Sequence, residues 1–139
     1  MPDRRKRKVL MQMRDLRVGN GIAACMMNYY EYTVQQGYSI DFLLNRYMDS
    51  PHTELIKKYG SRIYVLPHDT GKPDRKNYVY MKKVVMKEYD ILHVNISGLN
   101  ALEALRTAKR AGVGSRIYHA HNPKETSSVK AIIRSALYE

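Results

Sequence analysis

Short apolar runs alternate with longer segments whose apolar residues recur at helical spacing, and this alternation extends along the whole chain. Apolar runs of this length, bounded by turn residues, are typical of strands buried in a sheet. The pattern predicts five strands, over residues 9–13, 39–44, 62–66, 90–95 and 115–122. We expect the first strand to be central and parallel to its neighbours, and the fifth to be a buried strand.

The segments between the strands have the apolar spacing of amphipathic helices. Four helices are predicted there: from Ile22 to a stop at Gly37, over 53–59, through Tyr78, Met81 and Val85, and from Gly98 to a stop at Gly112. A fifth helix is predicted to begin at Asn122, where Asn, Pro and an acidic residue stand at the positions typical of a helix start.

Five strands alternating with five helices predict an α/β fold. The expected architecture is a Rossmann-like, doubly wound, mainly parallel sheet with helices on both faces, which is a three-layer sandwich. The length of 139 residues fits one domain. The last predicted helix runs to Glu139 without a stop signal. We therefore expect residues 1–139 to be a single, truncated domain that begins with a basic leader at 1–8.

The net charge is the property of the composition that bears most on possible partners. Lysine and arginine number 24 against 13 acidic residues, a net charge of +11, and five of the basic residues stand in the leader. A positive field of this size favours nucleic acid, anionic lipid or phosphorylated small molecules as partners. The alternative is a solvated surface that keeps the domain in solution. The tyrosines are scattered, without the spacing of RNA-binding sheets, so nucleic acid is the less favoured partner.

Cysteine content and hydropathy indicate the compartment. The single cysteine, Cys25, excludes an internal disulfide and favours a reducing environment. No apolar run approaches the roughly 18 residues needed to span a bilayer, and the segment after the leader is too short and polar for a signal peptide. We expect a cytoplasmic protein.

A glycine loop after the first predicted strand is the first candidate site. In such sheets ligands bind at the carboxyl ends of the strands, and the amides of Gly19, Asn20 and Gly21 are suited to an anionic group. The same glycines match a dinucleotide-binding fingerprint. However, five residues separate them from the strand, and Asn45 and Arg46 stand where that fingerprint needs an acid. A plain turn before a helix is the alternative.

Polar side chains also end the fourth and fifth predicted strands: His93 and Asn95 on one, His119, His121 and Asn122 on the other. If these strands are neighbours, the side chains share one edge of the sheet. We interpret His93 and His119 as hydrogen-bonded core residues, and His121, at the last strand position, as the functional histidine. His-x-His is a possible zinc pair, but no cysteine or acid accompanies it, so no metal site is predicted.

Hydrolase chemistry is not supported. The chain has no nucleophile elbow, no Walker loop and no paired carboxylates at strand ends. Asp41 stands at the start of its predicted strand, toward the opposite edge.

Six segments, in order along the chain, resemble one enzyme family. They are VLMQM (9–13) with the glycine loop, MMNYY (26–30), IDFL (40–43), YDILH (89–93), AKRAGV (108–113) and RIYHAHN (116–122). Together they resemble the opening of bacterial retaining glycosyltransferases of family four (group 1), which have the GT-B fold. The most similar branch acts in capsular polysaccharide and exopolysaccharide synthesis, and the resemblance covers nearly the whole chain.

The resemblance implies the N-terminal half of a GT-B enzyme, the acceptor-side domain, with the active site in a cleft to a second domain that binds the nucleotide sugar. It implies no cofactor, because the nucleotide sugar is the donor substrate, and it implies that residues 1–139 alone are inactive. It also implies a lipid-linked or polysaccharide acceptor and an anionic inner-membrane surface as partner. His121 is the predicted catalytic residue, beside the transferred sugar. The predicted substrate-binding residues are Gly19, Asn20, Gly21, His93, Asn95 and Asn122.

Two other function classes compete with the transferase. One is a stand-alone basic α/β binding module for nucleic acid or another anionic ligand, which uses the positive charge alone. The other is a nicotinamide-dependent oxidoreductase, which the glycine loop suggests and which predicts stabilisation by the cofactor.

Overall fold

The structure, a computed structural model, describes residues 6–120, apart from the side chain of Val84. Its strands are β1 (Lys8–Met13), β2 (Ser39–Leu44), β3 (Ile63–Val65), β4 (Ile91–Val94) and β5 (Ser115–Tyr118). Its α-helices are α1 (Gly21–Gln35), α2 (Pro51–Lys58), α3 (Arg75–Tyr80) and α4 (Leu99–Ala111). A π-helix, η1 (Met81–Val85), and a 3₁₀ helix, η2 (Met86–Glu88), continue α3.

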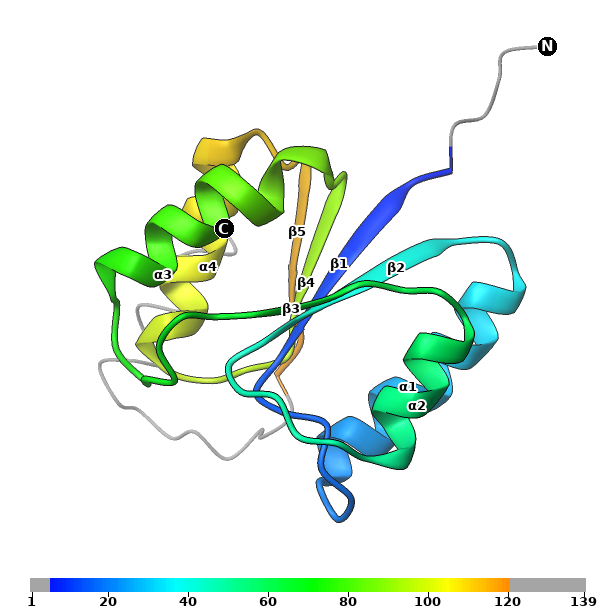
Figure 1. Ribbon diagram of the computed structural model, residues 1–139. Helices are drawn as coiled ribbons and strands as arrows, with labels where there is room; N and C mark the ends of the chain where they lie inside the picture. The colour runs from blue at the N-terminus through cyan, green and yellow to red at the C-terminus, as the bar shows by residue number, and fades with distance from the viewer. Residues whose placement is uncertain (1–5, 121–139) are drawn as a thin grey trace, which may run out of the picture.

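The five strands form one sheet in the order β3-β2-β1-β4-β5, and every neighbouring pair is parallel. In Figure 1, α1 and α2 lie on one side of the sheet, and α3 and α4 lie on the other. These three layers confirm the predicted Rossmann-like α/β fold. The first strand is central, as predicted, with β2 on one side and β4 on the other.

Each face of the sheet packs a separate hydrophobic cluster. Met11 and Phe42 face α1, where the ring of Tyr30 meets Phe42 edge-on with ring centroids 5.0 Å apart. Leu10 and Leu43 face the opposite way, in the cluster that includes the three buried alanines of α4. Because successive residues of a strand point to opposite faces, both faces of β1 and β2 are covered.

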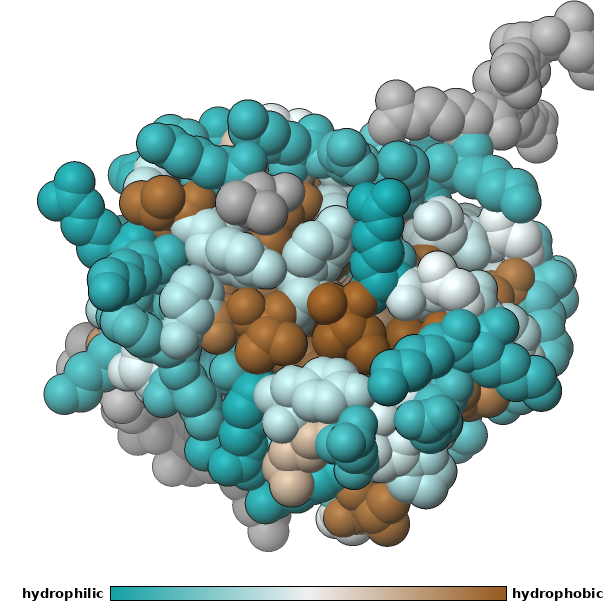
Figure 2. All heavy atoms as spheres, in the orientation of Figure 1, coloured by the Kyte–Doolittle hydropathy of each residue, from teal (hydrophilic) through white to brown (hydrophobic). Residues whose placement is uncertain are grey.

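The two edge strands are less well covered than the centre. All three residues of β3 are half-buried, and Figure 2 shows apolar side chains gathered near the middle of the view, over this strand. At the other edge, three of the four residues of β5 are exposed, with Ile117 at 47%.

The prediction that the fifth strand is buried is therefore wrong for the residues described. β5 has a neighbouring strand on one side only among them, because it stands at the end of the strand order. The strand ends at Tyr118, so His121, Asn122 and the fifth predicted helix lie outside the described residues.

The single helix predicted around Tyr78 is instead three consecutive helical segments, α3, η1 and η2. Met81, Val85 and Met86 are each 1% exposed and belong to the cluster beneath α4. Consecutive residues of a regular α-helix point about 100° apart. Val85, the last residue of η1, and Met86, the first of η2, are both buried in the core.

Candidate functional site

The strand order places a reversal at β1, because the chain continues to β2 on one side and returns to β4 on the other. In open parallel sheets, ligands bind beyond the carboxyl ends of the strands at such a reversal. Three segments leave β1 and its two neighbours at this edge: residues 14–20 after β1, 45–50 after β2 and 95–98 after β4. We call this edge, with these segments, the candidate site.

A buried carboxylate, Asp15, joins two of these segments. Its side chain has no exposed surface, and it accepts hydrogen bonds from the backbone amide of Arg17 at 3.2 Å and from Asn20 Nδ2 at 3.4 Å. Arg46, from the segment after β2, donates from Nε to Asp15 Oδ2 at 3.0 Å, and its Nη2 lies 2.9 Å from the same oxygen. A buried charge is tolerated when it is paired and hydrogen-bonded. This one fixes the loop after β1 against the loop after β2.

The pKa of Asp15 reports the balance of these contacts. Burial alone would raise it, because the charged form loses its hydration. The hydrogen bonds from the Arg17 backbone and the side chains of Arg46 and Asn20, with the charge of Arg17, outweigh burial and hold the pKa below its ordinary value. Asp15 therefore stays ionised at neutral pH and acts as a structural anion.

The predicted glycine loop forms the start of α1. Asn20 Oδ1 accepts hydrogen bonds from the amides of Ile22 at 3.0 Å and Ala23 at 3.3 Å, so Asn20 caps the helix. Gly19 has a φ of 92°, in the left-handed region, and Gly21 is the first residue of the helix. Two helix amides that could bind an anion are thus held by Asn20. A ligand here displaces that carboxamide or binds beside it.

Three carboxamide side chains are buried where β1, β2 and β4 end: Gln12 is 1% exposed, Asn45 4% and Asn95 3%. The backbone carbonyl of Gln12 accepts a hydrogen bond from the backbone amide of Asn95 at 2.9 Å, which extends the pairing of β1 with β4. Among the described residues, the side-chain oxygens of Gln12 and Asn45 have no hydrogen-bond partner. An unpaired buried acceptor costs roughly 1–3 kcal/mol, so a hydroxyl donor from a ligand would be favourable there.

His93 lies on β4, and His119 directly follows β5, the strand that pairs with β4. Their imidazole rings are stacked, with centroids 5.5 Å apart and planes 5° from parallel, and both residues are half-buried. Asn95 Nδ2 donates to the His93 carbonyl at 3.5 Å. The structure thus brings three of the predicted strand-end residues together. His121 and Asn122 lie outside the described residues.

The start of α4 lies at the same edge. Gly98, at its N-cap, has a φ of 95°, and no side chain among residues 6–120 caps the first turn. Asn100 is buried; its Nδ2 donates to the Thr70 carbonyl at 3.3 Å, and its Oδ1 has no partner in the described part of the chain. The backbone amides at a helix start attract anions, so the first turn of α4, before the Ala101 amide that donates to the Gly98 carbonyl, offers a second position for an anionic group.

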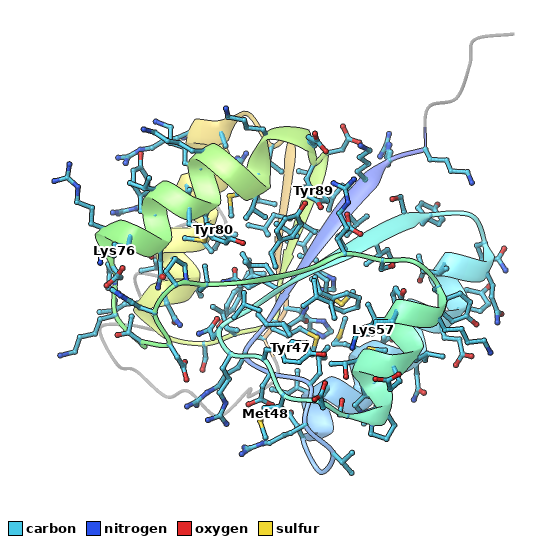
Figure 3. All side chains as sticks on the ribbon, viewed as in Figure 1. Tyr47, Met48, Lys57, Lys76, Tyr80 and Tyr89 are labelled. Carbon is cyan, nitrogen blue, oxygen red and sulfur yellow. The ribbon has the colours of Figure 1, made fainter. Side chains whose placement is uncertain are left out.

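Asp41 does not take part in this site. It accepts hydrogen bonds from the Tyr89 hydroxyl at 2.6 Å and the Arg62 amide at 2.8 Å, toward the amino ends of the strands (Figure 3 labels Tyr89). Burial, and then the nearby carboxylate, raise the pKa of Tyr89, so its hydroxyl keeps its proton.

Three features of the site were not predicted from the sequence: Asp15, its partner Arg46, and the position for an anion at the start of α4. In the sequence, Asp15 stands in a segment that resembles a spacer before the glycine loop. Arg46 stands where a dinucleotide-binding fingerprint needs an acidic residue, and no partner for its positive charge is apparent there. The positions of the two residues relative to the ends of their strands could have predicted this contact. Asp15 is the second residue after β1 and Arg46 the second after β2, and parallel neighbours end at the same edge.

Metal ligands do not gather in the part of the chain that the structure describes, where no group of three or more His, Cys, Asp or Glu could hold an ion. Within the same residues, none of the helices has the length and apolar character needed to cross a membrane.

Comparisons with protein-family models, curated proteins and solved structures found no match for this chain. Its function is therefore inferred from its residues and their geometry.

Proposed function

We propose that this chain is the N-terminal, acceptor-side domain of a retaining GT-B glycosyltransferase of the capsular or exopolysaccharide branch. The enzyme transfers a hexose from a nucleotide-sugar donor to a polysaccharide or lipid-linked acceptor. One observation carries the proposal: two of the segments that resemble this family end at the strand reversal. The glycine loop Gly19, Asn20 and Gly21 follows β1, and the segment YDILH (89–93) ends at His93 on the neighbouring strand β4.

The chemistry of the candidate site supports a sugar phosphate as ligand. Sugar hydroxyls are donors, and the buried oxygens of Gln12 and Asn45 are acceptors without a partner among the described residues. The starts of α1 and α4 are suited to the diphosphate. In this proposal His121 hydrogen-bonds the transferred sugar and stabilises the charge that develops on it, with Asn122 beside it.

The proposal requires a second domain that binds most of the nucleotide sugar. Residues 1–139 alone are therefore expected to bind ligands weakly and to transfer no sugar. The nucleotide sugar is a substrate, and the proposed reaction uses no cofactor or metal from this domain.

The positive charge supports a place at the inner face of a membrane, reached from the cytoplasm. Near an anionic membrane, each lysine or arginine contributes about 1 kcal/mol of attraction, and the chain carries a net charge of +11. We expect the protein to sediment with vesicles that contain phosphatidylglycerol and to be released by salt. Binding that salt does not weaken, or no binding, contradicts this part of the proposal.

The same charge supports a second candidate function, a stand-alone module that binds nucleic acid or another anionic ligand. Non-specific binding to DNA or RNA collapses as salt rises, because it depends on counterion release. Filter binding at low and moderate salt measures this directly. Salt-sensitive retention together with no sugar transfer by the complete gene product favours the module.

Ligand binding by the domain is tested by NMR, with the ¹⁵N-labelled chain titrated with a nucleotide sugar and with farnesyl diphosphate. We expect shift changes at Gly19, Gly21 and Asn95. His93→Ala should weaken binding, whereas His52→Ala, on α2, is the matched histidine control. No shift change at this edge with either ligand contradicts the site.

Transfer is tested on the complete gene product with a panel of nucleotide sugars. Loss of a group that stabilises developing charge typically costs a hundredfold or more in rate, so His121→Ala should lower turnover by about a hundredfold. Unchanged transfer in this variant removes His121 from the site.

A further inference from the structure

Positive charge is divided unequally between the two faces of the sheet. Residues 75–88 hold five lysines and arginines and one acid, and α4 holds three and one, so the helices on this face carry a net charge of +6. On the opposite face, α1 holds one acid and no base, and α2 holds two lysines and one acid, which gives a net charge of zero. The helices of one face therefore carry a strong positive field, and those of the other carry none.

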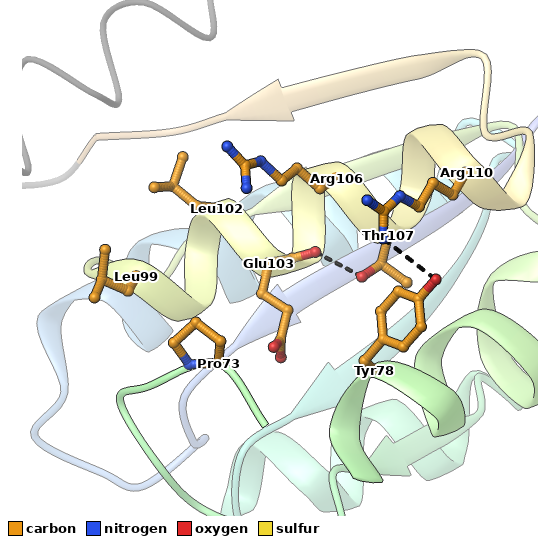
Figure 4. A pocket seen from close by; sticks show the side chains of 8 residues that line it. All are labelled: Pro73, Tyr78, Leu99, Leu102, Glu103, Arg106, Thr107 and Arg110. Atoms are coloured by element: carbon orange, nitrogen blue, oxygen red, sulfur yellow. Dashed lines mark hydrogen bonds between the residues drawn. The ribbon is translucent and has the colours of Figure 1, made fainter. Parts of the chain in front are cut away.

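A hollow of about 260 Å³ lies in this positive face, between α3 and α4 (Figure 4). Eight residues line it: Pro73, Tyr78, Leu99, Leu102, Glu103, Arg106, Thr107 and Arg110. All but Pro73 come from the two helices, so a hollow of this shape depends on how α3 packs against α4. It adjoins the candidate site only at Leu99, the first residue of α4, and from there extends along α4 to Arg110.

The two ends of the hollow differ in chemistry. Figure 4 shows Leu99, Leu102 and Pro73 toward one end, and Arg110 with Tyr78 toward the other. Arg106 stands one helical turn before Arg110, and in Figure 4 its guanidinium extends toward Leu102, between the two ends. An apolar end and a basic end suit a ligand that has an apolar body and an anionic head.

The basic end is not neutralised by the protein. Arg110 Nη1 donates to the Tyr78 hydroxyl at 3.4 Å, and Arg110 and Lys82 lie 5.8 and 5.7 Å from the centre of the Tyr78 ring. The hydrogen bond from Arg110 and the nearby positive charges of Lys82 and Arg110 lower the pKa of Tyr78. Within residues 6–120, the guanidinium of Arg106 makes no hydrogen bond or ion pair. Like charges four residues apart on a helix repel, and a bound anion relieves that repulsion.

Glu103 is the one acid in the lining. Its Oε2 accepts a hydrogen bond from the Asp74 amide at 2.7 Å, and burial raises its pKa. Figure 4 shows its carboxyl group between Pro73 and Tyr78, so it separates the two ends of the hollow. It can accept a hydroxyl or amide donor from a ligand that spans both ends.

We infer that this hollow is a binding site for a small organic anion, a carboxylate or phosphate ester whose head is held by Arg106 and Arg110 and whose apolar body covers Leu99 and Leu102. The site is independent of the proposed transferase reaction. Guanidinium groups bind both heads in the same fork geometry, so carboxylate and phosphate share this chemistry.

The test is an NMR titration of the ¹⁵N-labelled chain with four probes: phenyl phosphate, phenylacetate, benzyl alcohol and benzylamine. We expect shift changes at Tyr78, Leu102 and Arg106 with the two anions, and binding at least about tenfold weaker for the neutral and cationic probes. The relative affinity of the two anions then identifies the preferred head. Arg106→Gln with Arg110→Gln should weaken the better anion by about tenfold or more.

Lys87→Gln is the matched control, because Lys87 carries the same charge on the same face, is exposed, and does not line the hollow. It should change affinity less than twofold. Equal loss in Lys87→Gln shows that the whole face attracts anions without a site. Equal binding of benzyl alcohol shows an apolar groove only, and no binding at millimolar probe overturns the proposal. Circular dichroism of each variant separates lost binding from lost folding.

Discussion

Asp15 is a single residue that ties two loops of the candidate site together. Replacing it by asparagine leaves Arg46 and the Arg17 amide without a charged acceptor. Hydrogen bonds to charged groups contribute roughly 1.5–3 kcal/mol. We therefore expect Asp15→Asn to lower the free energy of unfolding by about 2 kcal/mol at pH 7, measured by urea denaturation.

Asp49→Asn is the matched control, since Asp49 is exposed and its hydrogen bond from the Tyr47 hydroxyl is on the surface. Its expected effect is below about 0.5 kcal/mol. An equal loss in the two variants would show that the buried position of Asp15 is unimportant.

The lowered pKa gives the Asp15 contribution a pH dependence. The folded protein holds this proton less tightly than the unfolded chain, so the contribution is complete above the ordinary pKa of 3.8 and is lost as pH falls through the lower pKa of the folded state. The difference between the parent protein and Asp15→Asn should be largest at neutral pH and should shrink in acid. A difference that grows on acidification contradicts this assignment.

These residues mark the limit of what sequence alone predicts. The Gly19 to Gly21 loop and the polar ends of β4 could be predicted, because turn residues and strand periodicity are local signals. The contact between Asp15 and Arg46 could not, because the two residues are 31 positions apart and meet only once β1 and β2 are paired. The burial of the Gln12 side-chain oxygen likewise could not be predicted, because it depends on the strands that pack beside β1.

At the scale of elements, two helix starts contrast in how they use glycine. Gly98, before α4, has a φ of 95°, and a side chain added there would meet Asn100 Oδ1 at 3.4 Å. Gly21, the first residue of α1, is not in the left-handed region and has nothing within 4 Å of such a side chain. Strained backbone positions cost roughly 1–3 kcal/mol, whereas Gly→Ala at a compatible position stabilises by up to about 1 kcal/mol.

We therefore expect Gly98→Ala to destabilise the protein by about 1–3 kcal/mol and Gly21→Ala to be neutral or slightly stabilising. Thermal and urea unfolding of both variants measure the contrast. A similar cost for the two substitutions contradicts the backbone argument.

Element boundaries were predicted best where local signals are strongest. The expected bounds of the second strand agree with β2, and Gly37 follows the end of α1. The start of α2 was placed two residues late, although Ser50 caps that helix and Pro51 begins it. The exposure of β5 was not predicted, because an apolar run has the same pattern at the centre and at the edge of a sheet.

At the scale of the whole molecule, the unequal charge of the two faces predicts a salt effect on stability. Repulsion among exposed cations is screened as ionic strength rises, with a Debye length of about 10 Å at 0.1 M. We expect the melting temperature to rise by a few degrees between about 20 mM and 500 mM sodium chloride. The reason is relief of repulsion within the face formed by α3, η1, η2 and α4.

Paired variants locate the effect. Lys83→Gln with Lys87→Gln removes two exposed charges four positions apart from the positive face and should reduce the salt effect. Lys57→Gln with Lys58→Gln removes two charges from α2, where Lys57 lies 3.7 Å from Glu54, and should change it less. An equal change in the two pairs shows that the repulsion is spread over the molecule.

The central place of β1 also has a consequence for how the chain is made. β1 is synthesised first; its partner β2 is complete at residue 44, but its other partner, β4, is complete only at residue 94. At roughly 5–20 residues per second, those fifty residues take about 3–10 s on a ribosome. For that time one edge of the apolar strand β1 has no partner strand. The central strand of the folded sheet is therefore exposed to incorrect pairing for longer than β2 is while the chain is being made.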